Sequence, residues 1–319
     1  MLDPQAPLRF VVNAAAGHGE VERVRALIDP LLAAAGRPAL WLMSGPGELG
    51  HVAREAAAQA HQSRGAVVAV GGDGTINTVA QAAHAAGCAL GVVPQGTFNY
   101  FARSHGIPFD AAEAGAFLLV AEPVAVQVAA VNERLFLVNA SLGLYPDLLE
   151  DREAYKARWG RSRLVALGAG FLTLLRAQRR LRLQIELQGE LCEVRALTLF
   201  VGNNRMQLRQ LGVEASGRGG DATGHGLVTA VMLRPVGTLS MLGLMWRGAM
   251  GTLGEADDVE RFTFTRMRVQ PSRWTGRRSV KVAYDGEVCR LPAPLDFRVH
   301  PRPLYLLKAP GGAAQEDEA

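Results

Sequence analysis

A run of apolar residues ends in a cluster of glycines at residues 67–77, where the chain reads Val-Val-Ala-Val-Gly-Gly-Asp-Gly-Thr-Ile-Asn. The apolar run predicts a short buried strand because glycine bounds it. Gly71, Gly72 and Gly74 let a ligand approach the backbone closely. The helical pattern that follows offers unpaired N–H groups and a positive dipole end to an anion. The stretch predicts either a phosphate-binding corner, with Asp73 placed to meet a metal ion or a hydroxyl, or a tight turn without a ligand.

The first part of the chain alternates strand and helix patterns. Helical patterns follow the strands that we expect at residues 8–12, 39–43, 67–70 and 89–93. Such alternation predicts a parallel sheet with right-handed crossovers and with ligands at the carboxyl ends of the strands. We therefore expect an α/β nucleotide-binding domain with a parallel sheet over residues 1–122.

The pattern changes after Pro123, where strand signals dominate. We expect a β-rich, antiparallel, sandwich-like domain over residues 123–300, with helices at 162–180 and 238–253, and a disordered tail at 311–319. The expected strands cover residues 124–131, 135–140, 181–187, 191–201, 227–233, 259–269, 279–284 and 296–300.

Composition narrows the class of protein. The chain has 319 residues, 49% of them hydrophobic, which is typical of a globular protein. Its formal net charge of +4 suits an anionic substrate or membrane surface without requiring one. Its three cysteines lie far apart, which favours the cytoplasm. The apolar stretches near 164–175 and 239–246 are too short to span a bilayer, so we expect a soluble chain. Neither a zinc site nor a nucleic-acid motif is expected.

A second glycine corner follows the next predicted strand, with Gly96, Thr97 and Asn99 in sequence. Both corners are expected at one edge of the sheet, where backbone N–H groups hold phosphate oxygens and Thr75, Thr97 and Asn99 add polar contacts. Thr97 and Asn99 are also ordinary helix caps. Asn13 after the first strand and Ser44 after the second are expected at the same edge.

Asp285, Gly286 and Glu287 form a third motif near the end of the chain. Asp-Gly is first of all a turn signal. In a functional interpretation, Glu287 accepts the proton of a substrate hydroxyl as it attacks a phosphate, and Asp285 orients that site or a bound magnesium ion.

The three motifs, in this order and at this spacing, resemble the diacylglycerol kinase catalytic-domain family, and its bacterial soluble lipid kinases above all. The resemblance extends over nearly the whole chain. It implies a nucleotide-binding domain and a β-sandwich domain, with the active site in the cleft between them, and a last strand at 304–307 that returns so that residues 301–310 complete the first domain. It also implies ATP and Mg²⁺ as cofactors, Thr97 and Ser44 at the nucleotide, and Glu287 as proton acceptor. The residues that it assigns to the ATP phosphates are Gly71, Gly72, Asp73, Gly74, Thr75, Ile76 and Asn77.

The chain departs from the family pattern at three positions. Ala14 follows Asn13 where the family usually has proline, and Tyr100 stands where an aspartate is usual. Without that acid, Asp73 and Asp285 are the expected magnesium partners, and Asp73 is the one that we expect beside ATP. His225 replaces an aspartate that helps to hold a structural magnesium ion, so we do not expect that second metal site.

The sequence thus predicts an ATP- and Mg²⁺-dependent lipid kinase that phosphorylates the hydroxyl of diacylglycerol or a related lipid. A transient contact with the inner face of the membrane is expected, and residues 150–163 offer either a basic, aromatic lipid-headgroup contact or a solvated helix face. Residues 239–246 fit core packing better than an acyl-chain pocket. Two alternatives are a kinase for a soluble substrate such as NAD and a non-catalytic nucleotide or lipid sensor.

Overall fold

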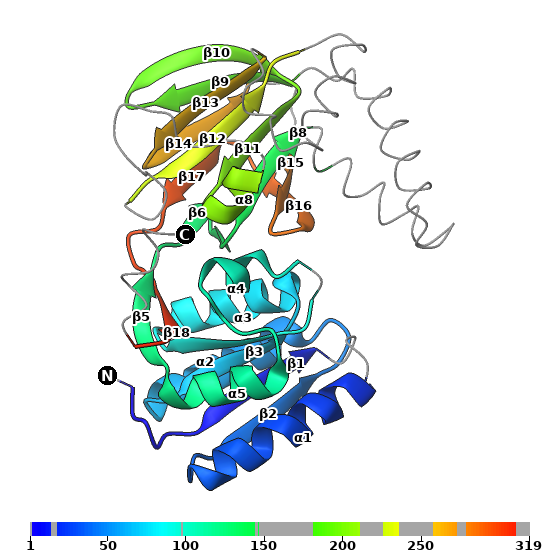
Figure 1. Cartoon of the computed structure of the whole chain (residues 1–319). Coiled ribbons are helices and arrows are strands. Elements are labelled where there is room, and N and C mark those ends of the chain that lie inside the picture. The colour runs from blue at the N-terminus through cyan, green and yellow to red at the C-terminus, as the bar shows by residue number, and fades with distance from the viewer. Residues whose placement is uncertain are drawn as a thin grey trace. The chain divides into compact units, whose positions relative to one another are not determined.

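A computed structural model describes residues 2–13, 18–96, 98–143, 146, 181–210, 226–235, 258–272 and 279–310. The helices expected at 162–180 and 238–253, the basic stretch 150–163, Thr97, His225 and the tail at 311–319 lie outside these residues. The chain divides into two compact units (Figure 1), one formed by Met1–Val128 with Pro301–Ala319 and the other by Ala129–His300.

The first unit is built on a six-stranded sheet in the order β2-β1-β3-β4-β18-β5. All neighbouring strands are parallel except the antiparallel pair of β18 and β5. Every residue of β3 and β4 is buried, as expected for parallel strands covered on both faces. The strands are β1 (Leu8–Asn13), β2 (Ala39–Ser44), β3 (Ala66–Gly71), β4 (Ala89–Pro94), β5 (Glu122–Val126) and β18 (Leu304–Lys308).

Helices cover both faces of this sheet (Figure 1). They pack in two pairs, α2 with α3 and α1 with α5. Ile28 of α1 and Leu118 of α5 share one apolar cluster with Phe10 and Val68 of the sheet. The helices are α1 (His18–Ala34), α2 (Leu49–Gln62), α3 (Asp73–Ala86), α4 (Tyr100–Ser104) and α5 (Ala111–Val120). The predicted α/β architecture is confirmed.

The first unit extends beyond Pro123, where the strand pattern begins. The expected strand at 124–131 is two strands: β5 pairs with β18 in the first unit, and β6 (Ala129–Val131) belongs to the second. Gln127 and Val128 lie between these strands, so the division falls later than residue 122. Nε2 of His84 lies 3.1 Å from the carbonyl oxygen of Arg302 and connects α3 to the segment that returns into the sheet.

The second unit is a sandwich of two antiparallel six-stranded sheets, in the orders β10-β9-β14-β17-β6-β7 and β13-β12-β11-β8-β15-β16. One apolar cluster joins the inner faces, with Phe136 and Phe297 from the first sheet and Leu142 and Phe264 from the second. The β-rich second half is therefore confirmed. Beyond β6, its elements are β7 (Arg134–Phe136), β8 (Asn139–Gly143), β9 (Leu181–Leu187), β10 (Glu190–Ala196), β11 (Thr198–Gly202), α8 (Arg205–Gln210), β12 (Val228–Leu233), β13 (Val259–Phe264), β14 (Arg266–Pro271), β15 (Ser279–Tyr284), β16 (Glu287–Pro292) and β17 (Leu295–Val299).

Two long strands expected in this unit are each a pair of strands that changes sheet. The segment at 191–201 divides at Leu197 into β10 and β11, and the segment at 259–269 divides at Thr265 into β13 and β14. In each case a single residue connects the two strands, so the sequence shows no turn signal where the chain passes from one sheet to the other. Strand β16 was not expected, because its sequence Glu-Val-Cys-Arg-Leu-Pro carries little of a strand's usual composition.

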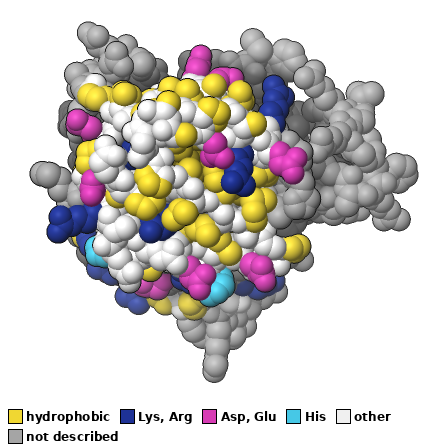
Figure 2. Space-filling view, turned by 90° about the horizontal axis from the view of Figure 1, so that it is seen from below, with side chains coloured by type: hydrophobic (Ala, Val, Ile, Leu, Met, Phe, Trp, Pro, Cys, Tyr) yellow, Lys and Arg dark blue, Asp and Glu magenta, His cyan; other side chains and the backbone are white. Residues whose placement is uncertain are grey.

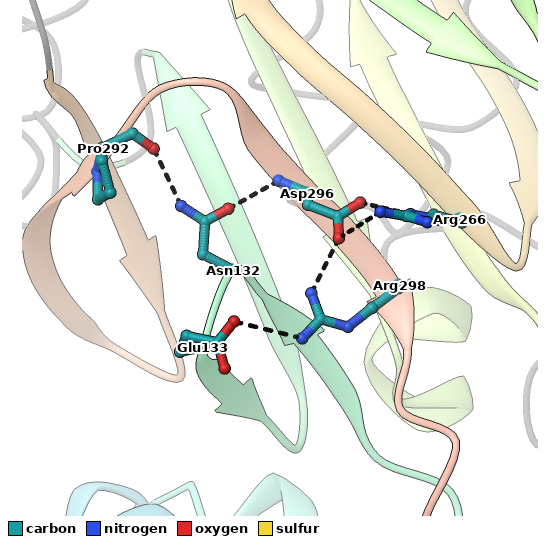
Figure 3. Close-up of polar contacts among 6 residues, drawn as sticks. All are labelled: Asn132, Glu133, Arg266, Pro292, Asp296 and Arg298. Atoms are coloured by element: carbon teal, nitrogen blue, oxygen red, sulfur yellow. Dashed lines mark hydrogen bonds and ion pairs between the residues drawn. The ribbon is translucent and has the colours of Figure 1, made fainter.

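Asn132 fixes the turn of the β6–β7 hairpin against β17 (Figure 3). Its Oδ1 accepts the N–H of Asp296 at 2.8 Å, and its Nδ2 donates to the carbonyl oxygen of Pro292 at 2.9 Å. The Asp296 carboxylate binds Arg266 at 2.8 Å and Arg298 at 2.9 Å, while Arg298 also reaches Glu133 at 3.8 Å. The bonds from the Asn132 side chain to the backbone hold the hairpin turn against β17. The ion pairs of Arg266 with Asp296 and of Arg298 with Glu133 each have one exposed partner and add little to stability.

Candidate functional site

The two glycine corners of the first unit touch each other. Strands β3 and β4 end side by side, with Gly71 paired to Pro94, and the N–H of Gln95 donates to the carbonyl oxygen of Gly71 at 2.9 Å. A Cβ atom on Gly96 would lie 2.8 Å from Cα of Gly72 and 2.6 Å from Oδ1 of Asn99. No side chain fits there, so Gly96 is required for the close approach of the corners.

The first turn of α3 begins at this contact. Gly72 is its N-cap and supplies no capping side chain, which leaves the first N–H groups to other partners. A Cβ atom on Gly71 would lie 2.7 Å from Oγ1 of Thr75, so the strand enters the helix through a turn too tight for a side chain. The positive end of the helix dipole thus lies at the half-buried residues Gly72, Asp73 and Gly74, a position that would favour an anion.

The Asp73 side chain connects the two corners. Its Oδ2 accepts the backbone N–H of Asn99 at 2.9 Å, and Nδ2 of Asn99 donates to the carbonyl oxygen of Gly96 at 2.7 Å. Asn99 adopts a left-handed conformation (φ 46°) that directs its N–H to Asp73. Burial raises the pKa of Asp73, against the opposing effect of the N–H groups of Asn99 and Tyr100.

Two buried oxygen atoms at this contact have no hydrogen-bond partner: Oδ1 of Asp73 and Oδ1 of Asn99. A buried acceptor without a partner costs free energy, and native structures rarely leave one unexplained. Both atoms are hard oxygen acceptors, and both belong to residues at the contact of the two glycine corners. They are therefore the atoms at which a cation or a hydrogen-bond donor is expected.

The other expected nucleotide contacts differ in where their side chains lie. Ser44 is completely buried and its Oγ donates to the carbonyl oxygen of Val12 at 3.1 Å, while Asn13 lies beside it in the strand register. Asn77 is buried in α3, where its Oδ1 accepts Nε2 of Gln81 at 2.7 Å. Thr75 and Ile76 are buried as well. The structure thus brings residues 71–75, Gly96 and Asn99 together. The Asn77 side chain bonds within α3 instead, and Thr97 lies outside the described residues.

The third motif forms the turn between β15 and β16 in the second unit. Asp285 (φ 44°) and Gly286 (φ 87°) both adopt left-handed conformations, the signature of a type I′ hairpin. The Asp285 carboxylate is buried and accepts the N–H groups of Leu137 at 2.7 Å, Val138 at 2.9 Å and Asn139 at 3.0 Å. Three backbone donors engage its oxygens, so Asp285 fixes the loop that leads into β8.

Glu287 is exposed at the start of β16, directly after this turn. Tyr284 is buried and pairs with Glu287 across the hairpin, and its hydroxyl lies 3.4 Å from Oε2 of Glu287. Burial and the nearby Glu287 charge raise the pKa of Tyr284 to about 12. The hairpin therefore presents Glu287 to solvent with a neutral phenol beside it, a position in which a carboxylate is able to accept a proton.

Sequence reasoning missed an aromatic pair at the second corner. Phe98 and Tyr100 stack with ring centroids 5.8 Å apart and an interplanar angle of 3°. The signal was present in the sequence, since two aromatic residues flank Asn99 in a chain with only 6% aromatic residues.

The comparisons with known proteins agree with the motifs and the fold. Residues 7–131 match the model of the diacylglycerol kinase catalytic domain. Over these residues the chain is similar to that catalytic domain. It is 36% identical over 145 residues to a probable lipid kinase YegS-like of Klebsiella pneumoniae (strain 342), a match that covers 44% of this chain and 47% of that protein. It is 33% identical over 168 residues to a probable lipid kinase YegS-like of Cronobacter sakazakii, covering 50% and 54%. The matches span about half the length of these relatives.

A solved structure extends the likeness of the fold to both units. The crystal structure of a diacylglycerol kinase from Bacillus anthracis str. Sterne matches with a TM-score of 0.67 at 19% identity, covering 96% of this chain and 97% of that one. The predicted resemblance and fold class are confirmed. The roles of the individual site residues stay predictions.

The described part of the chain contains neither a membrane-spanning helix nor a cluster of metal-binding side chains. None of its helices combines the length and the apolar character needed to cross a membrane. Among the same residues, three or more His, Cys, Asp or Glu side chains nowhere gather as a metal-binding group. Figure 2 shows one face on which hydrophobic side chains are interspersed with charges of both signs.

Proposed function

We propose that this protein is an ATP- and Mg²⁺-dependent lipid kinase that transfers the γ-phosphate to a lipid hydroxyl of the diacylglycerol type. The observation that carries the proposal is the contact of the two glycine corners, where the start of α3 and the unpartnered oxygens of Asp73 and Asn99 lie together. The catalytic-domain match and the relatives named probable lipid kinases support the same reaction class.

The ATP phosphates bind at the first turn of α3 in this proposal. Its N–H groups and residues 71–75 hold the phosphate oxygens, and Gly96 keeps the approach open. Ser44, Asn13 and Thr97 belong to the nucleotide side of the site. The first two support it through the ends of β1 and β2.

The residues present fit a magnesium ion. Oδ1 of Asp73 and Oδ1 of Asn99 are oxygen ligands of the kind that Mg²⁺ prefers, and Mg²⁺ commonly takes one or two protein ligands and completes its shell with phosphates and waters. When bound there, the ion neutralises charge on the phosphates. Asp285 is not part of this set, because its carboxylate is engaged by three backbone N–H groups.

Glu287 accepts the proton of the lipid hydroxyl. The lipid oxygen forms a bond to the γ-phosphorus, the bond from that phosphorus to the bridging oxygen breaks, and ADP leaves with the electron pair. Tyr284 and Asp285 position this carboxylate by holding the hairpin that carries it. The lipid acceptor brings the protein to a membrane surface, at the cytoplasmic face in this proposal.

The direct test is a kinase assay with labelled ATP against a total lipid extract, with the product identified by mass. Phosphorylated lipid that depends on Mg²⁺ is the expected result, and the absence of any labelled lipid at saturating ATP and Mg²⁺ would overturn the proposal. A labelled NADP product would favour a soluble-substrate kinase. Binding of ATP without turnover would favour the sensor, for which the replacement of acids by Tyr100 and His225 is the motivating observation.

A further inference from the structure

An aromatic surface lies at the second glycine corner of the first unit. Phe98, Tyr100 and Phe109 belong to one short segment that ends in the loop before α5. Phe98 is 47% exposed and Phe109 is 40% exposed, and these are the two phenylalanines among the large hydrophobic residues that the described part of the chain exposes. An aromatic ring with this exposure presents a face on which a flat ligand is able to stack.

The Phe98 ring is held in place by its surroundings. It stacks in parallel on Tyr100, with centroids 5.8 Å apart, within the range of favourable offset stacks. Asn99, between the two, is fixed by its bonds to Asp73 and Gly96. Nε of Arg103 donates to the carbonyl oxygen of Phe98 at 2.8 Å. A ring fixed in this way loses little conformational entropy when a flat ligand binds.

The ring is also close to the phosphate corner. Phe98 follows Gly96 by two residues, which limits their Cα atoms to about 7 Å apart, and Gly96 is in contact with Gly72 at the start of α3. A ligand whose phosphates lie at that helix therefore has its remaining atoms within reach of the Phe98 ring.

We propose that Phe98, supported by Tyr100, is a stacking platform for the nucleobase of the phosphate donor. This inference rests on the proposed function, since it assumes a nucleotide at the glycine corners. A planar heteroaromatic ring matches a rigid, parallel aromatic pair in shape and polarisability, as base stacking on aromatic side chains does elsewhere. Because every base has a π-face, the platform strengthens nucleotide binding with little choice among bases.

An anionic membrane is the less favoured occupant of this surface. Asp110 and Glu113, both exposed, lie within four residues of Phe109 and repel anionic headgroups. The Arg103 side chain is engaged within the segment, because its guanidinium lies over the Phe109 ring at 4.6 Å and its Nε donates to the carbonyl oxygen of Phe98.

The test compares the affinity for ATP with that for inorganic tripolyphosphate, which has the phosphates without the base. Calorimetry on the full chain should show that Phe98→Ala weakens ATP roughly 5- to 150-fold, the range for the loss of one base–aromatic stack, and leaves tripolyphosphate unchanged. Phe98→Trp should restore the affinity for ATP, because it restores a π-face.

Phe109→Ala is the matched control. It removes an equally exposed ring from the same segment and should leave both affinities as in the wild type. Equal losses of ATP and tripolyphosphate in Phe98→Ala would overturn the platform, because the corner itself would then be damaged. An unchanged affinity for ATP together with weaker sedimentation on phosphatidylglycerol vesicles would also overturn it, in favour of a lipid contact.

These outcomes are separable from those of the kinase proposal. A base-dependent loss of ATP affinity in Phe98→Ala, with no phosphorylated lipid in the wild type, would support the platform and contradict the kinase. Phosphorylated lipid in the wild type with an unchanged ATP affinity in Phe98→Ala would do the reverse. A wild type that binds neither ATP nor tripolyphosphate would overturn both.

Discussion

The carboxylate of Asp73 accepts the backbone N–H of Asn99 at 2.9 Å, so a residue at the start of α3 holds the turn that follows β4. One oxygen of Asp73 thereby serves the structure, while the other is buried without a partner. This division lets a single carboxylate join two corners and still present an acceptor to a ligand. It also leads to two predictions that separate stability from binding.

The first concerns stability and pH. Burial raises the pKa of Asp73, and a carboxyl whose pKa is higher in the folded chain contributes stability that is fully present below its unfolded pKa, about 3.9. That contribution is lost as the pH rises through the folded pKa. Asp73→Asn retains an oxygen for the Asn99 N–H but does not titrate. Without ligands, the melting temperature of the variant minus that of the wild type should therefore rise from about pH 4 to about pH 7. A difference that falls over this range would contradict the raised pKa.

The second concerns magnesium. If Oδ1 of Asp73 holds Mg²⁺ beside the phosphates, Mg²⁺ should strengthen ATP binding to the wild type and have little effect on Asp73→Asn. Titration calorimetry with and without Mg²⁺ measures this directly. Glu113→Gln removes an exposed carboxylate of the same unit and should respond to Mg²⁺ as the wild type does. The same response in Asp73→Asn would exclude Asp73 as a ligand.

A third prediction tests the proton acceptor. Glu287→Gln should lower phosphoryl transfer roughly 100- to 10,000-fold, the usual contribution of a positioned base. The affinity for ATP should not change, because in the proposed reaction Glu287 accepts the proton of the lipid hydroxyl and does not hold the ATP phosphates. Glu190→Gln alters another exposed glutamate of the second unit and should leave turnover intact. Unchanged turnover in Glu287→Gln would require another base.

The alternation of elements and the glycine corners were predictable from the sequence because they rest on local rules. Apolar runs bounded by glycine identified β3 and β4, and the Asp285-Gly286 signal marked a true hairpin turn. Chain position alone did not reveal that β5 pairs with the distant β18, or that β10 passes into β11 across one residue. Those features depend on contacts between remote segments, and periodicity carries no information about them.

The same limit applies to Asp285. Its residue type is typical of a catalytic or metal-binding group, and only the three N–H groups of residues 137–139 show how its oxygens are engaged. The bonds join positions almost 150 residues apart, and no spacing rule predicts them. Asp73 shows the converse, because its sequence context and its unpartnered oxygen both indicate a ligand.

A fourth prediction concerns the bonds between the Asp285 carboxylate and the backbone N–H groups of residues 137–139. Asp285→Ala should lower the free energy of unfolding by about 3 kcal/mol or more, because it leaves buried N–H groups without acceptors. Asp285→Asn should cost less, since one oxygen still accepts the N–H groups of Val138 and Asn139. Urea denaturation measures the loss, and hydrogen exchange should show it first at residues 137–139. A stable variant with an altered Mg²⁺ requirement would instead indicate that Asp285 serves a metal.

A fifth prediction concerns the return of the chain to the first unit. Leu306 is completely buried and lies between Leu90 of β4 and Val124 of β5, so β18 fills the gap between two strands. Leu306→Ala should lower the free energy of unfolding by about 2–5 kcal/mol, the usual cost of a cavity in a core. Tyr305→Ala is the matched control, because the neighbouring side chain is 45% exposed and its loss should cost no more than about 0.5 kcal/mol. The affinity for tripolyphosphate should fall at temperatures where Leu306→Ala begins to unfold, since β4 carries Gly96 and Asn99 at its end. Equal stability of the two variants would show that β18 is not an integral strand of this six-stranded sheet.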